Sequence, residues 1–94
     1  MNVKQAVAIA KAHVADIFAD ESIANLGLEE VKFDENDDVW QITVGFARPW
    51  DRRLVPGIAP GIPGSDPGRT YKIVYISDID GKVLQVAHRE MFHS

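Results

Sequence analysis

Cysteine is absent from this 94-residue sequence, and this absence excludes disulfides and thiol chemistry. Long hydrophobic runs are missing as well, since no stretch reaches the 18 or more apolar residues of a membrane-spanning helix. The N-terminal segment carries one early lysine, and Lys11, His13 and Asp16 interrupt its short apolar run. This pattern differs from that of a signal peptide. We therefore expect a cytoplasmic protein without a membrane partner.

An excess of basic residues is also lacking, because the formal net charge is −4. This acidic total argues against general nucleic-acid affinity. The charge is uneven, with −6 in residues 1–38 (nine acids, three bases) and +2 in residues 39–94 (five acids, seven bases). The apolar fraction of 46% and the charged fraction of 26% are typical of a globular chain. At this length we expect a single domain over residues 1–94.

The N-terminal segment has the spacing of an amphipathic helix, which we predict over about residues 3–19. Asn2 followed three residues later by Gln5 resembles a capping box. Gly27 is a plausible stop for the helical region. The apolar stripe consists of Val3, Ala6, Val7, Ala10, Val14, Ile17 and Phe18.

The remainder of the chain has the two-residue alternation of strands, predicted at about 27–34, 39–47, 69–77 and 82–89. "DIDG" at 78–81 has the residues of a hairpin turn between the last two strands. The predicted fold class is therefore α+β. We expect an N-terminal amphipathic helix packed on a four-stranded antiparallel β-meander, with a long Pro/Gly-rich loop at 48–68 between the second and third strands.

The third strand is apolar on both sides, which predicts that both of its faces are buried. One side carries Tyr71, Ile73 and Tyr75, and the other carries Val74 and Ile76. We expect Val39 and Val83 to lie on the side of Val74. One helix covers one face, so the other needs a second cover. Two covers remain open: a second protein chain, or the loop through its apolar residues Leu54, Val55, Ile58 and Ile62.

The sequence departs from each of the ligand-binding motifs that it partly matches. "GIPGSDPGRT" is one residue too short for a phosphate-binding loop, has arginine where lysine is required, and precedes a strand. "DIDG" lacks the later glutamate of a calcium loop. The histidines His13, His88 and His93 lack metal-site spacing. We therefore predict no cofactor, no metal, no catalytic residue and no enzymatic activity.

"FARPWDRR" at 46–53 is the most distinctive polar stretch, because arginines flank a tryptophan. Arginine and tryptophan are typical of protein-contact hot spots. Two other interpretations stay open: Trp50 folding back under a stacked arginine, or base stacking with nucleic acid. The predicted partner-binding residues are Arg48, Trp50, Arg52, Arg53, Ile58 and Ile62.

The order of elements resembles that of PepSY-type domains, which repeat a Trp-led strand, a connection, a Tyr-led strand and a D/N-G turn. The matching residues are Trp40, Ile42, Val44, Tyr71, Ile73, Tyr75, Asp80, Gly81, Val83 and Leu84. The chain is also similar in outline to gas-vesicle accessory proteins of the O type. The PepSY resemblance implies an inhibitory or regulatory role. PepSY-type domains are typically exported or membrane-linked, so the expected lack of a signal sequence and the 48–68 insertion depart from them.

These patterns predict a small non-catalytic binding or regulatory module that acts through protein–protein contacts of the Arg/Trp and Pro/Gly loop region. One alternative is a homodimeric structural or accessory protein that uses the apolar sheet face. Another is a small ligand-binding domain or enzyme with a pocket under the loop.

Overall fold

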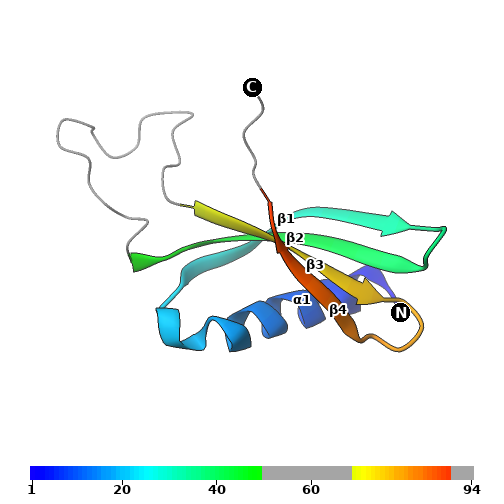
Figure 1. The fold of residues 1–94 in the computed structure, drawn as a ribbon, viewed down its shortest axis with the longest axis horizontal. Helices are drawn as coiled ribbons and strands as arrows, with labels where there is room; N and C mark the ends of the chain where they lie inside the picture. The colour runs from blue at the N-terminus through cyan, green and yellow to red at the C-terminus, as the bar shows by residue number, and fades with distance from the viewer. Residues whose placement is uncertain (50–68, 90–94) are drawn as a thin grey trace, which may run out of the picture.

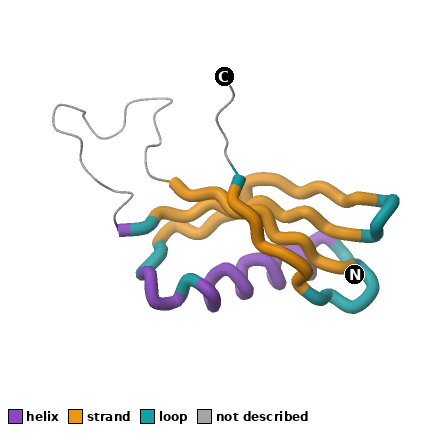
Figure 2. Tube along the Cα trace, viewed as in Figure 1, coloured by secondary structure: helices purple, strands orange, loops and turns teal. Residues whose placement is uncertain are grey.

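The computed structural model describes residues 1–49 and 69–89 of the chain. One helix lies across one face of a four-stranded antiparallel sheet (Figure 1), whose strands follow chain order from β1 to β4. Figure 2 shows the same two layers, the helix in purple and the strands in orange. The predicted α+β fold class is confirmed. The elements are α1 (Val3–Ile17), η1 (Ala19–Glu21), β1 (Ala24–Asp34), β2 (Val39–Ala47), β3 (Arg69–Ser77) and β4 (Val83–His88).

Helix α1 begins with the predicted capping box. The Asn2 side chain accepts a hydrogen bond from the Gln5 backbone N–H at 2.8 Å, and the Gln5 side chain accepts one from the Asn2 backbone at 2.8 Å. These bonds satisfy backbone donors that the first turn of a helix leaves open. The helix turns Ala6, Ala10 and Val14 toward the sheet, and all three are fully buried. Two alanines in this stripe let the helix axis approach the strands closely.

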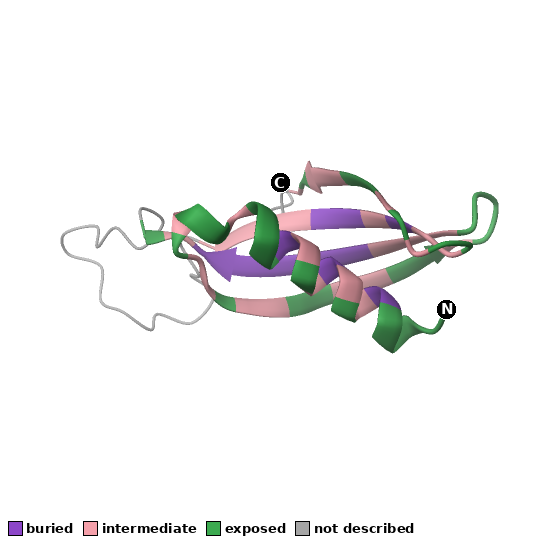
Figure 3. Cartoon of the chain, turned by 90° about the horizontal axis from the view of Figure 1, so that it is seen from below, coloured by how far each residue is buried: buried purple, intermediate pink, exposed green. Residues whose placement is uncertain are grey.

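The core lies between α1 and the two central strands, as the buried stripes in Figure 3 show. Ile42 and Val74 pair directly across β2 and β3, and both are 0% exposed. Val83 packs against this core, as expected. Val39 does not, because it pairs with Ser77 and so shares the opposite face with Tyr75. The expectation for Val39 was wrong, since register and not hydrophobicity decides the face of a strand residue.

Strand β1 begins earlier than predicted, at Ala24, so Gly27 is a strand residue and not a helix stop. Asn25 has a positive φ of 58°, and the pairing with β2 is irregular between Ala24 and Gly27 and again between Leu28 and Glu30. Such irregularities break the two-residue alternation from which a strand is recognised in sequence.

The β3–β4 connection is the hairpin turn predicted at "DIDG". Gly81 has φ +71°, a conformation that favours glycine, and its N–H donates to the Ser77 carbonyl at 2.9 Å. Asp78 Oδ1 accepts a hydrogen bond from the Trp40 indole at 2.8 Å and lies 3.3 Å from the Met1 ammonium. These two donors hold the pKa of Asp78 below its ordinary value, and they connect the turn to β2 and to the N-terminus.

Candidate functional site

Only one of the six predicted partner-binding residues, Arg48, falls within the described part of the chain. Trp50, Arg52, Arg53, Ile58 and Ile62 lie outside the described residues, and so do Leu54 and Val55 of the predicted sheet cover. The describable part of the site is therefore the end of the sheet at which β2 and β3 are joined by the 48–68 connection. Ala47 and Arg69 pair directly at this end, so the last residue of β2 lies beside the first residue of β3.

Arg48 lies against the chain's own aromatic rings on the helix side of the sheet. Its guanidinium carbon is 4.8 Å from the ring centroid of Phe18 and 5.5 Å from that of Phe46. Its Nε lies 3.5 Å from a carboxylate oxygen of Glu21, and its side chain is 18% exposed. Cation–π contact and ion pairing hold this guanidinium in place.

Lys72 joins Arg48 at this corner. Its ammonium lies 5.8 Å from the Phe18 ring centroid. Burial lowers the pKa of Lys72, the Arg48 charge lowers it further, and Glu21 opposes both effects. Phe18 caps the C-terminal end of α1, whose last turn contains no basic residue. Arg48 and Lys72 therefore place positive charge near the end of the helix that carries partial negative charge.

The Arg69 side chain lies across the face of the sheet opposite α1. Its Nη2 donates to the Asn25 carbonyl at 3.2 Å and to Glu29 Oε2 at 3.3 Å. A Cβ added at Gly45 would lie 2.9 Å from this Nη2 and 2.9 Å from Cε1 of Tyr71. The guanidinium and the tyrosine ring therefore lie directly over the Gly45 backbone.

Arg89, just beyond β4, reaches across the same face to the far edge of the sheet. Its Nη1 donates to Thr43 Oγ1 at 2.9 Å and to Glu30 Oε1 on β1. The hydrogen bond from Arg89 is the main cause that lowers the pKa of Glu30. Thr43 is 0% exposed although it faces away from α1. Sequence reasoning missed Arg69 and Arg89, because no local pattern indicates partners so distant along the chain.

We name this second surface the open face and define it by Tyr71, Ile73 and Tyr75 of β3 with Arg69 and Arg89 lying beside them. Alternation along β3 puts the first three on the side opposite Val74, away from α1. Ile73 is 9% exposed and both tyrosines are half-buried. The prediction that β3 is buried on both faces thus holds in part, and the arginines provide cover that the sequence analysis did not foresee.

The remaining candidate ligands are dispersed. His13 lies on α1 and His88 ends β4, while His93 lies outside the described residues. Within residues 1–49 and 69–89, no three histidine, aspartate or glutamate side chains gather as a metal site would need. None of the helices in the described part of the chain is long and apolar enough to cross a bilayer.

Comparisons of the chain with protein-family models, with curated proteins and with solved structures found no match. The resemblance to PepSY-type domains and to O-type gas-vesicle accessory proteins stays a prediction.

Proposed function

We propose that this chain is a small non-catalytic binding or regulatory module of the cytoplasm that acts through protein–protein contacts. The contact surface would combine the open face with the loop residues Trp50, Arg52, Arg53, Ile58 and Ile62, while Arg48 at the root of the loop packs against Phe18 and Phe46 on the helix side. One observation carries the proposal: the open face presents tyrosines and arginines on a sheet whose opposite face holds the helix. Tyrosine and arginine are the side chains on which interface affinity most often depends.

The arginines of the open face are already ordered. Arg69 is held by Asn25 and Glu29, and Arg89 by Thr43 and Glu30. A partner would therefore lose little side-chain entropy when it binds them. The Ala47–Arg69 pair puts both roots of the loop beside Tyr71, so a partner that contacts the loop roots would also reach the open face.

The proposal predicts that replacing Trp50, Ile58 and Ile62 together by alanine abolishes capture of the specific partner. The measurement is a quantitative affinity capture with the full chain as bait, in which proteins enriched by the wild type are compared with those enriched by the variant. Ile79 and Leu84 are 85% and 54% exposed and lie in the β3–β4 turn and near the start of β4, at the other end of the sheet from Ala47 and Arg69, so a double alanine variant there is the matched control. Equal capture by the triple variant, with an unchanged melting temperature, would contradict the proposal.

A homodimer is the second candidate, and the charge pattern of the open face favours it. Glu29 and Glu30 lie beside Arg69 and Arg89 there, so two copies related by a two-fold axis can pair opposite charges. Sedimentation velocity at micromolar concentration tests this arrangement. A dimer that a Tyr75→Glu variant dissociates would support it, and a strict monomer would eliminate it.

A further inference from the structure

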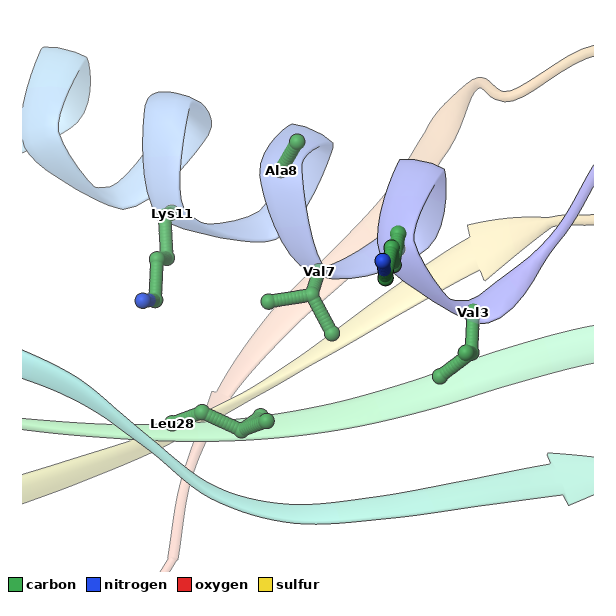
Figure 4. A pocket seen from close by; sticks show the side chains of 6 residues that line it. Val3, Val7, Ala8, Lys11 and Leu28 are labelled. Carbon is green, nitrogen blue, oxygen red and sulfur yellow. The ribbon is translucent and has the colours of Figure 1, made fainter.

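A shallow apolar groove of about 410 Å³ runs between α1 and the edge strand β1, on the helix side of the sheet (Figure 4). Val3 and Val7 point from the helix toward Leu28 on β1. Val3 is 43% exposed and Leu28 is 44% exposed, so the floor of this groove is apolar surface that residues 1–49 and 69–89 leave accessible. The lining residues are Val3, Lys4, Val7, Ala8, Lys11 and Leu28.

Two lysines give this groove a basic margin. Lys4 and Lys11 are seven residues apart, so they lie on one side of α1 and about 10.5 Å apart along its axis. Ala8 lies between them and adds little bulk. Among the described residues, no carboxylate lies within 4 Å of either ammonium group.

We infer that this groove binds an acidic amphipathic helix of a partner protein. Apolar side chains at i, i+3 and i+4 of such a helix would enter the groove, as in other helix-in-groove complexes. Acidic residues seven positions apart would meet Lys4 and Lys11, because two helices lying side by side share the same rise per residue.

The positive charges of Lys4 and Lys11 also distinguish among possible occupants of the groove. An α1 helix from a second copy of this chain would bring its own Lys4 and Lys11 to the contact and no acidic pair of that spacing. A basic helix would meet the same two lysines unfavourably. The groove lies on the face opposite the open face, so this inference is independent of the proposed function.

The test uses a fluorescein-labelled synthetic peptide of about three heptads, with leucine at the apolar positions and glutamate at the flanking ones. Fluorescence anisotropy measures its binding to the full chain, and a peptide with lysine in place of glutamate is the control. We expect the chain to bind the acidic peptide. Lys4→Glu/Lys11→Glu should weaken that binding about tenfold or more, since two partly exposed ion pairs together contribute about 1.4 kcal/mol. The same variant should gain affinity for the basic peptide.

A second pair of variants tests the apolar floor. Leu28→Ser should abolish binding, whereas Leu84→Ser, at an exposed leucine on β4, should leave it unchanged. Circular dichroism melts check that each variant folds, and the Trp50/Ile58/Ile62 alanine variant should bind the peptide normally. The inference is overturned if the charge-reversed chain binds the acidic peptide as well as the wild type does. It is also overturned if both peptides bind equally. Displacement of the peptide by a second copy of the chain at high concentration, or by dodecanoate as a probe for fatty acids, would show that the groove holds that occupant instead and would overturn the inference as well.

Discussion

At the scale of single residues, Gly45 shows how the open face depends on the absence of a side chain. Glycine inside a strand normally weakens it, because it adds backbone entropy to the unfolded chain and contributes no packing. Here its bare backbone is the surface on which the Tyr71 ring and the Arg69 guanidinium lie. The loss in strand propensity is offset by a contact that any β-carbon would prevent.

We therefore predict that Gly45→Ala destabilises the fold by about 1–3 kcal/mol, the usual cost of an overpacked site. The arginine end is flexible, but the tyrosine ring, with Cδ1 3.0 Å from the added carbon, has to move. The measurement is urea unfolding of both proteins followed by tryptophan fluorescence. Gly27→Ala is the matched control, since its added carbon would have no neighbour closer than 3.9 Å. Equal stability changes for the two variants would contradict this account.

The same scale shows how far the candidate site could be predicted. Arg48 was identified because Trp50 and two further arginines are its neighbours in sequence. Its contacts with Phe18 and Glu21 could not be, because they depend on where the end of α1 lies over the sheet. Arg89 and Glu30 are 59 residues apart, and only the register of four strands brings them together.

At the scale of elements, helical spacing and strand alternation were sufficient for the fold, because both record which face of an element is buried. Alternation along β2 put Ile42 and Val44 on one side, and both lie in the core. Alternation could not place Val39, whose face depends on the pairing with Ser77, or the start of β1, where Asn25 has a positive φ. Register and local backbone irregularity are thus what periodicity misses.

The close packing of α1 on the sheet predicts that a larger side chain between them destabilises the fold. Ala10 is fully buried against the core, so Ala10→Leu should push α1 away from the strands and cost about 1–3 kcal/mol. Ala15→Leu adds the same side chain at an exposed position and should change stability little. Thermal unfolding by circular dichroism compares the two. If the Ala10 variant were as stable as the Ala15 variant, the close packing of the helix would be refuted.

At the scale of the whole molecule, carboxylates form hydrogen bonds between elements that are far apart in the sequence. Glu30 on β1 receives Arg89 from beyond β4, and Asp78 in the hairpin turn receives Trp40 from β2. Both carboxyl groups have a pKa below the ordinary value, so the folded state favours their ionised forms. By linkage, these contacts stabilise the fold when the carboxyls are ionised, and protonation removes that contribution.

The expected outcome is a free energy of unfolding that is maintained above about pH 5 and falls as the pH drops through the lowered pKa values of Glu30 and Asp78. Urea titrations at several pH values between 7 and 3 measure it. A Glu30→Gln/Asp78→Asn variant should be less stable at pH 7 and should lose less stability on acidification. An acid dependence as steep as that of the wild type would show that other carboxyls are responsible.

The irregular pairing of the edge strands has a consequence for behaviour at high concentration. Strand β1 departs from regular pairing twice, and β4 departs from it once, opposite Tyr75 and Ile76. An edge that is flat and regular invites another chain to add a strand, which is the first step toward fibrils, and bulges interrupt such a template. Each outer strand thus discourages strand-by-strand aggregation, while tyrosines, arginines and the lysine-lined groove remain accessible on the two faces of the sheet.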